Sequence, residues 1–185
     1  MNDTIKSIMD RRSIRAYTDA PLSDEQITAL KECALASPTA MNAQSWHFSF
    51  VTDRSAINSV ENAVVDIIMR SDNEPMKERI KSRSNKIFYD APLAVFISAD
   101  RSSRWGAVDA GIAVQNLALA AHSMGLGSVI IGMCAMAFEN DADRVLSKKL
   151  GFPEGHDFAI AIAIGHPAAG KDAHPVQEGK ITDIN

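Results

Sequence analysis

Residues 105–124 read WGAVDAGIAVQNLALAAHSM, which predicts one long helix, rich in alanine and apolar on nearly all sides. A helix of this kind must be covered by other elements all round, because it offers no broad polar face to water. Gly125 follows directly and ends the helix, since glycine readily adopts the left-handed backbone found after many helices. Gln115, Asn116 and His122 interrupt the apolar residues, so the stretch is too short and too polar to span a membrane.

Four other apolar segments have the alternating or continuous pattern of β-strands. They are residues 46–51, 93–99, 128–131 and 158–164. Further helices are expected over residues 4–11, 55–69, 76–89 and 141–150, and between a capping box at Ser23 and a stop at Pro38. Because helices and strands do not alternate regularly, the order favours an α+β fold over a doubly wound parallel sheet. No repeat or long linker divides the chain, so residues 1–185 are expected to form one domain.

The overall composition is that of a soluble globular protein, with 46% hydrophobic and 23% charged residues. The net charge of −4 disfavours nucleic acid as a partner, because phosphate backbones attract basic surfaces. Cys33 and Cys134 lie in apolar surroundings and form no C-x-x-C pair, which suits a reducing compartment. The N-terminal residues MNDTIK contain no apolar leader. These features predict a cytoplasmic protein with no membrane segment.

Three arginines and a serine form the sharpest cluster, Arg11-Arg12-Ser13-Ile14-Arg15. If the segment is extended, Ser13 and Arg15 point to one side of it. The preceding helix ends near Arg11, and a helix C-terminus repels anions, so side-chain cations would have to hold any phosphate there. Arginine suits that work because its planar guanidinium donates two hydrogen bonds to phosphate oxygens. The alternative is a solvated basic turn whose arginines neutralise the helix end.

Residues 37–46, SPTAMNAQSW, connect a helix to a strand and hold a second dense set of hydrogen-bonding side chains. Loops that enter a buried strand often carry binding groups. Asn42 and Gln44 each offer donors and acceptors, which matches a heterocycle edge of mixed polarity, such as the pyrimidine side of a flavin. The alternative is a capped turn in which both side chains bond their own backbone.

Taken in order, these two clusters resemble the nitroreductase family. The chain carries RRSIR at residues 11–15 and SPTAMNAQSW at residues 37–46. It continues with DAGIAVQNLALAAHSMGLGS at residues 109–128, with Ile130-Ile131-Gly132, and with IGHP at residues 164–167. The motifs follow the family order and cover almost the whole chain.

The resemblance implies an α+β fold with a mixed, mainly antiparallel sheet flanked by helices, built as an intertwined homodimer with two FMN sites at its interface. It implies that the FMN phosphate and ribityl chain contact Arg11, Arg12, Ser13 and Arg15. The residues that would approach the flavin from the partner subunit are Pro38, Thr39, Asn42 and Gln44. Those that would lie against its ring are Ile130, Ile131, Gly132 and Met133. The implied reaction passes a hydride from NAD(P)H through flavin N5 to a nitroaromatic, quinone or enone acceptor by a ping-pong mechanism, with no catalytic side chain.

The chain departs from the family pattern mainly at the end that would hold the phosphate. His166 stands where family members commonly have a tyrosine after the glycine, and Ser45 replaces the usual proline. A late arginine or lysine usually assists the phosphate, and here Lys171 and His174 are the candidates. The five histidines show no metal-ligand spacing, so no metal is expected.

Three other functions stay open at this point. A relative on the same fold could carry out flavin fragmentation or reductive dehalogenation. A flavin-binding sensor or storage protein would hold the cofactor with negligible turnover. A non-flavin domain could use the arginines to hold another phosphate. The charged segment 76–89 is also a candidate lid over the site.

Overall fold

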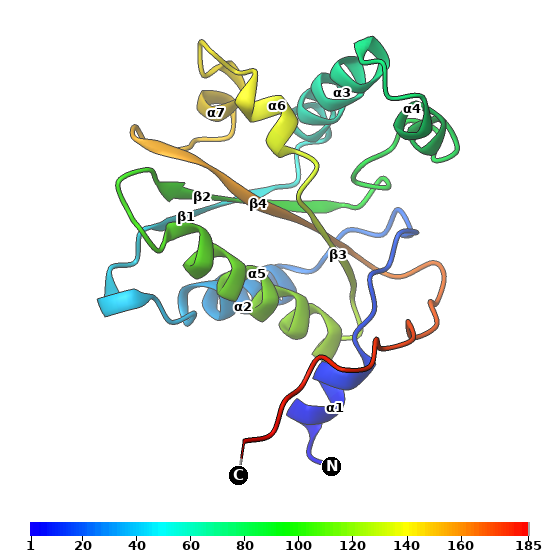
Figure 1. The fold of residues 1–185 in the computed structure, drawn as a ribbon, viewed down its shortest axis with the longest axis vertical. Coiled ribbons are helices and arrows are strands. Elements are labelled where there is room, and N and C mark those ends of the chain that lie inside the picture. The colour runs from blue at the N-terminus through cyan, green and yellow to red at the C-terminus, as the bar shows by residue number, and fades with distance from the viewer. Residues whose placement is uncertain (185) are drawn as a thin grey trace.

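The computed structural model describes residues 1–184 and shows one four-stranded sheet between two layers of helices (Figure 1). The strands are β1 (Trp46–Val51), β2 (Leu93–Asp100), β3 (Gly127–Ile131) and β4 (His156–Gly165). They lie in the order β1-β2-β4-β3, and each neighbouring pair is antiparallel. Within the described residues, a parallel pairing exists only as an isolated bridge between Ser13 and Ser128. The four predicted strands and the α+β class are confirmed, and β3 is left at an edge of the sheet.

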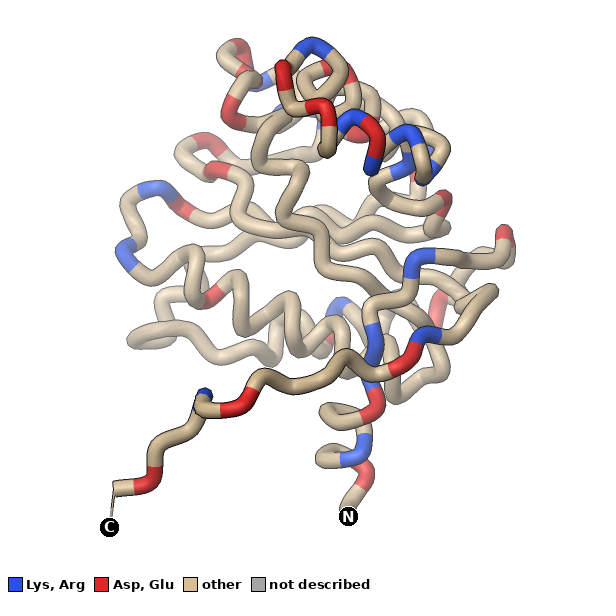
Figure 2. The backbone as a smooth tube through the Cα atoms, turned by 45° about the vertical axis from the view of Figure 1, so that its right-hand side comes forward, with Lys and Arg blue, Asp and Glu red and all other residues tan. Residues whose placement is uncertain are grey.

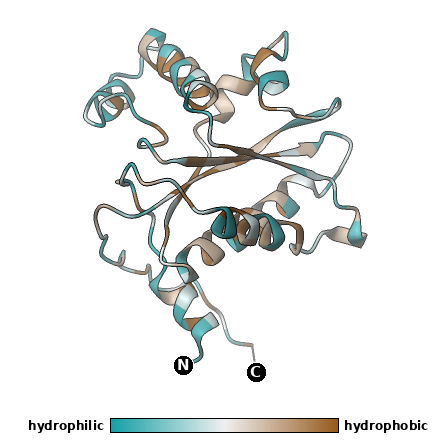
Figure 3. Ribbon diagram, turned by 180° about the vertical axis from the view of Figure 1, so that it is seen from behind, coloured by the Kyte–Doolittle hydropathy of each residue, from teal (hydrophilic) through white to brown (hydrophobic). Residues whose placement is uncertain are grey.

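Helices cover both faces of this sheet (Figure 1). On one face lie α2 (Asp24–Leu35) and α5 (Gly106–Ser123), and α1 (Asp3–Asp10) packs against α5. On the other face lie α3 (Arg54–Arg70), α4 (Glu74–Lys81), α6 (Ala135–Glu139) and α7 (Val145–Lys149). Figure 3 shows the same layers from behind, with hydrophobic strands in the middle and many hydrophilic residues on the helices. The predicted capping box is confirmed at the start of α2, where Ser23 and Gln26 bond each other's backbone amides.

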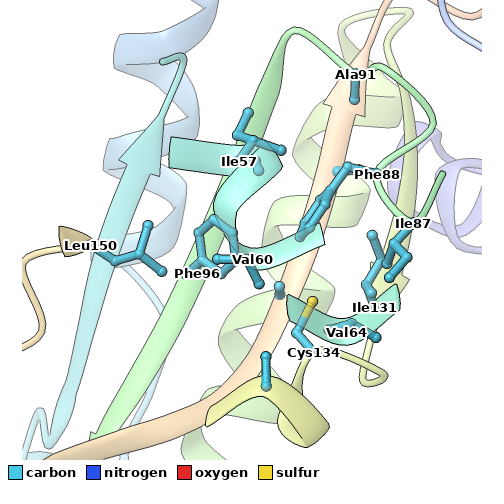
Figure 4. Close-up of a cluster of buried hydrophobic side chains, with 14 of the residues drawn as sticks. Ile57, Val60, Val64, Ile87, Phe88, Ala91, Phe96, Ile131, Cys134 and Leu150 are labelled. Carbon is cyan, nitrogen blue, oxygen red and sulfur yellow. The ribbon is translucent and has the colours of Figure 1, made fainter. Parts of the chain in front are cut away.

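The side chains of β2 alternate between two hydrophobic cores. Leu93, Val95 and Ile97 pack in the core under α2 and α5, whereas Ala94 and Phe96 belong to the core under α3 and α6. Figure 4 shows this second core, with side chains from several elements gathered around Phe96. Every residue of β2 except the last is buried, because helices cover the strand from both sides.

The predicted helix over residues 76–89 is wrong in its second half, since α4 ends at Lys81. Beyond it, Ser84 and Asn85 adopt left-handed backbone angles, with φ of 53° and 59°. The Asn85 amide turns back and donates a hydrogen bond to the Ile80 carbonyl at 3.0 Å. Serine and asparagine favour such turns because their side chains compete for backbone hydrogen bonds.

The predicted helix over residues 141–150 is also shorter than expected, and the short α6 before it was not predicted. The Asp141 carboxylate accepts hydrogen bonds from the amides of Leu146 and Ser147 at 3.1 and 2.9 Å. Arg144 lies between them in the sequence with a left-handed φ of 56°. The helix therefore begins only at Val145, because Asp141 caps it across an irregular turn.

Helix α5 buries Ala110, Ala113 and Leu117 in the core, but it is not covered on every side. Val108 and Ile112 are 53% and 38% exposed. The expectation of complete cover is wrong for a single chain, because the sheet and α2 occupy only part of the helix circumference. Within residues 1–184, no helix combines the length and the apolar character that crossing a bilayer requires.

Candidate cofactor and substrate site

The segment after α1 lies along the free edge of β3. The Ile14 amide donates a 2.9 Å hydrogen bond to the Ser128 carbonyl, and bridges at Ser13 and Tyr17 fasten the segment at both ends. Ile14 packs directly over Gly127, where an added Cβ would lie 3.0 Å from the Ile14 Cβ. A glycine at this position lets the two backbones approach closely.

A cavity of about 530 Å³ opens beside this segment, next to the end of α5. Arg11 and Arg12 line it together with Lys171 from the C-terminal tail. Neither arginine forms an ion pair with a carboxylate within residues 1–184. Asp10 is the one acidic residue among those that line the cavity. Three cations at one cavity suit a phosphate group, because charge-assisted hydrogen bonds to phosphate are strong. His174 is not among the lining residues, so the structure does not bring it to this site.

Arg12 also serves the helix that precedes it. Its guanidinium donates hydrogen bonds to the carbonyls of Met9 at 2.6 Å and Arg11 at 2.9 Å. These bonds satisfy carbonyls that the end of α1 leaves without helical partners. The alternative interpretation, a basic residue that neutralises the helix end, therefore applies to Arg12.

A second cavity, of about 200 Å³, continues along the same strand edge. Residues 125–128 line the first cavity and residues 129–133 line the second, so the two follow one edge of β3. The predicted ring-binding residues lie together in this second cavity; they are Ile130, Ile131, Gly132 and Met133. We call the two cavities, which follow each other along the edge of β3, the β3 track.

The members of the arginine motif reach different parts of the β3 track. Arg15 lines the second cavity, whereas Arg11 and Arg12 line the first. Ser13 lines neither cavity: its backbone pairs with Ser128, and its carbonyl accepts a 3.3 Å hydrogen bond from the Arg15 guanidinium. The structure therefore does not gather all four motif residues at one phosphate site, because the extended segment carries Arg15 past the first cavity.

The opposite wall of the second cavity is basic, and the sequence motifs missed it. Arg79, Arg83, Lys86 and Tyr89 line it from α4 and the turns that follow. The Arg83 guanidinium donates a 2.8 Å hydrogen bond to the Tyr89 hydroxyl and lies 5.9 Å from the centre of its ring. A signal for this wall was present, because residues 77–86 contain five Lys or Arg.

The second predicted cluster lies at the other end of α5. The Ala40 amide bonds the carboxylate of Asp109 in the first turn of this helix, whereas His122 in its last turn lines the first cavity. At 1.5 Å of rise per residue these two helix positions are roughly 20 Å apart. Within one chain the structure therefore does not bring this cluster to the β3 track; its members are Pro38, Thr39, Asn42 and Gln44.

The loop that holds this cluster has a strained backbone. Met41, Asn42 and Gln44 have positive φ angles of 55°, 54° and 48°. Thr39 accepts a hydrogen bond from the Gln44 amide at 3.0 Å, and the Gln44 side chain donates to Asn42 at 3.1 Å. Asn42 and Gln44 are exposed, and Met41 is fully exposed. Backbone strain of this kind persists where the surrounding contacts hold a loop in one shape, and such loops are common at binding sites.

Two groups near the track, the half-buried hydroxyl of Tyr17 and the buried thiol of Cys134, are structural. Burial raises the pKa of Tyr17 far above its ordinary value, and its hydroxyl donates a 2.8 Å hydrogen bond to the Ile14 carbonyl. Burial likewise raises the pKa of the Cys134 thiol, which is fully buried, so this cysteine is not a redox group. Among residues 1–184, no three His, Cys, Asp or Glu side chains are arranged to hold a metal ion.

Comparison with known proteins identifies the family of this chain. A model described as the Nitroreductase family matches residues 8–166, which is most of the chain. The chain belongs to the nitroreductase family. The motifs over residues 11–15, 37–46 and 109–128 lie within the matched region, so the resemblance seen in the sequence is confirmed.

Individual nitroreductases and flavin reductases are similar over nearly the full chain. The chain is 31% identical to an NADPH-flavin oxidoreductase of Vibrio harveyi, covering 100% of this chain and 77% of that protein. It is 30% identical to an NAD(P)H FMN reductase of Bacillus subtilis, covering 91% of this chain and 67% of that protein. A solved nitroreductase with bound FMN from Desulfitobacterium hafniense has a TM-score of 0.94 and 32% identity, covering 100% of both chains.

Proposed function

We propose that this protein is an FMN-dependent oxidoreductase that transfers a hydride from NAD(P)H to a small oxidised acceptor, such as a nitroaromatic, a quinone or an enone. The β3 track supports this proposal: Arg11 and Lys171 line one end of it, and the edge strand and following turn, residues 129–133, line the other opposite a basic wall. FMN also has two ends, since a ribityl chain joins its phosphate to a flat ring, so one end could occupy each cavity. The similar nitroreductase with bound FMN supports the choice of cofactor. We assign residues 1–185 to one domain of this kind.

The first cavity fits the phosphate of FMN. Arg11, Arg12 and Lys171 supply the cations, and α1 cannot attract the anion because its C-terminus faces this region. Arg11 is the principal ligand in this proposal, since Arg12 already donates to the end of α1. His174 stays a weaker candidate that would have to approach by movement of the exposed tail.

The second cavity fits the flavin ring. Residues 130–133 line it with an edge strand and the turn after it, and Ile130 is 36% exposed. Arg15 lies at this end, so we propose that it faces the pyrimidine edge of the ring rather than the phosphate. Ser13 contributes its backbone, which fastens the segment that carries both Arg11 and Arg15.

We also propose that the active protein is a homodimer. Within one chain the loop of residues 38–44 and the β3 track lie at opposite ends of α5. Val108 and Ile112 leave an apolar strip exposed on the same helix. A second copy packed on this strip would cover it, and a two-fold axis would exchange the helix ends. Pro38, Thr39, Asn42 and Gln44 of each chain would then approach the flavin of its partner.

When bound, FMN supplies the hydride chemistry, and the chain positions it and shapes access. Both cavities are open to solvent, and we propose that donor and acceptor use the same open side of the ring in turn, by a ping-pong mechanism. The segment 76–89 forms one wall of this cavity, which supports the hypothesis that it controls access. The free thiols of Cys33 and Cys134 suit the reducing cytoplasm that we propose as its compartment.

A visible spectrum of the purified protein, followed by NAD(P)H oxidation with a panel of acceptors, tests the proposal. We expect a yellow dimer that oxidises NAD(P)H faster when a nitroaromatic or quinone is added. A yellow protein with no steady-state turnover would indicate a sensor or storage protein. A colourless protein after expression with ample riboflavin would overturn the flavin assignment and favour another phosphate ligand.

A further inference from the structure

The second cavity holds more positive charge than a flavin ring requires. Four basic residues line it, but Lys86 is paired with Asp90 at 2.8 Å and lies 3.6 Å from Glu61. Arg15, Arg79 and Arg83 have no carboxylate partner within residues 1–184. An oxidised flavin ring is uncharged, and its phosphate would have separate cations at the first cavity. If Arg15 faces the ring, no group of FMN is assigned to the guanidiniums of Arg79 and Arg83.

The basic residues of α4 and of the turn after it fall into two groups, those paired with a carboxylate and those without a carboxylate partner within residues 1–184. Lys77 pairs with Glu74 at 2.7 Å and Lys81 pairs with Glu78 at 2.8 Å, in i,i+3 pairs that do not line the cavity. Arg79 and Arg83 are four residues apart and both line the cavity without a carboxylate between them. Arg79 lies in the last turns of α4 and Arg83 in the turn after it, and neither forms an ion pair within residues 1–184, so neither charge is used to pair with a carboxylate.

Arg83 is held in place before any ligand arrives. Its Nη1 donates to the Tyr89 hydroxyl at 2.8 Å, and the guanidinium lies over the Tyr89 ring. A guanidinium has five N–H donors, so most of those on Arg83 stay available to a ligand. Figure 2 shows several basic residues of the upper helices and of the N-terminal segment on the same side of the molecule.

We propose that Arg79 and Arg83 bind an anionic group of a substrate and thereby select charged over neutral substrates. The group is a phosphate of the nicotinamide nucleotide or a carboxylate on the acceptor, since a guanidinium pair recognises either through charge-assisted hydrogen bonds. This inference rests on the proposed function, because it places the substrate in the cavity beside the flavin ring.

The test compares the holoenzyme with an Arg79→Ala/Arg83→Ala variant and a Lys77→Ala/Lys81→Ala control, which removes the same charge from α4 outside the cavity. Michaelis constants are measured for NADPH and NADH with a fixed acceptor, and for 4-nitrobenzoate and nitrobenzene with a saturating donor. We expect the arginine variant to stay yellow and to show a KM raised about ten-fold or more for the anionic substrate. The KM for nitrobenzene and every KM of the lysine control should stay unchanged.

The pattern of KM changes identifies the group that is bound. A higher KM for NADPH alone indicates that the arginines bind the 2′-phosphate. A higher KM for both nucleotides indicates the pyrophosphate, and a higher KM for 4-nitrobenzoate alone indicates the acceptor carboxylate. Unchanged KM values in a yellow, active variant overturn the inference, and so does loss of flavin, which would show that the arginines hold the cofactor. If the double variant does not fold, Arg79→Gln and Arg83→Gln are measured singly. A colourless, inactive wild-type protein would instead mean that the proposed function is wrong.

Discussion

The Ala40 amide donates a 3.1 Å hydrogen bond to Oδ1 of Asp109, while Oδ2 of the same buried carboxylate has no partner within residues 1–184. This contact ties the strained loop of residues 38–44 to the first turn of α5, where the helix dipole favours a negative charge. The same hydrogen bond therefore links the loop, with its exposed Asn42 and Gln44 side chains, to the helix that we propose as the dimer core.

Replacement of Asp109 by alanine should destabilise the protein by about 1–3 kcal/mol, because the Ala40 amide loses its acceptor. Asp109→Asn keeps an acceptor at Oδ1 and removes a charge that has a single hydrogen bond, so it should change stability by less than about 1 kcal/mol. Urea unfolding of both variants measures the difference. Equal losses for alanine and asparagine would show that the charge, not the hydrogen bond, fixes the loop.

Gly127→Ala should weaken the docking of the N-terminal segment on β3. The new Cβ would lie 3.0 Å from Ile14, and overpacking of this kind costs about 1–3 kcal/mol. We expect lower thermal stability and weaker FMN binding together, since the same segment carries Arg11 and Arg15. An unaffected Gly127→Ala protein would mean that the segment can shift without loss.

Arg11→Glu should lower the affinity for FMN by about ten-fold or more, because a carboxylate repels the phosphate that the arginine would bind. Riboflavin has no phosphate, so its affinity should not fall. Titration of the apoprotein with both flavins, followed by fluorescence, separates the two effects. Equal weakening of FMN and riboflavin binding would contradict a phosphate site at the first cavity.

Ile112→Glu should separate the proposed dimer, because it places a charge in the exposed apolar strip of α5. The monomer should also lose flavin, since the loop of residues 38–44 would no longer reach the partner's track. Size-exclusion chromatography combined with the visible spectrum measures both. Val145→Glu is the control, as Val145 is 64% exposed on α7 at a distance from the strip. A wild-type protein that already elutes as a monomer would contradict the dimer directly.

Stability should fall with rising pH above about 10, partly because of Tyr17. Burial raises the pKa of this hydroxyl in the folded protein, so the folded state holds its proton while the unfolded state releases it. The stabilising effect is complete below the unfolded pKa and is lost as pH rises toward the folded pKa. The free energy of unfolding of Tyr17→Phe should therefore fall less between about pH 9 and 11, the range in which an unperturbed tyrosine titrates. Chemical unfolding at several pH values measures this decline. An identical decline would assign the effect to other groups.

Much of the architecture could be predicted from local pattern. The apolar run of β2 and the alternation of β1 predicted strands, because burial on one or both faces leaves a direct trace in the sequence. The helix from Gly106 to Ser123 was predicted for the same reason. The predicted helices failed where a side chain acts on distant backbone, as Asp141 does on Leu146 and Ser147.

The sequence by itself determined the class of fold, the strands, the central helix and the family, because periodicity and motif order are local properties of the chain. Only the tertiary structure decided that Arg15 and Arg11 line different cavities, that Lys171 and not His174 lines the first cavity, and that Arg79 and Arg83 line the second. The physical reason is that these placements depend on the pairing of the N-terminal segment with β3 and on the turn after α4. Such contacts join residues far apart in the chain, so no local spacing encodes them.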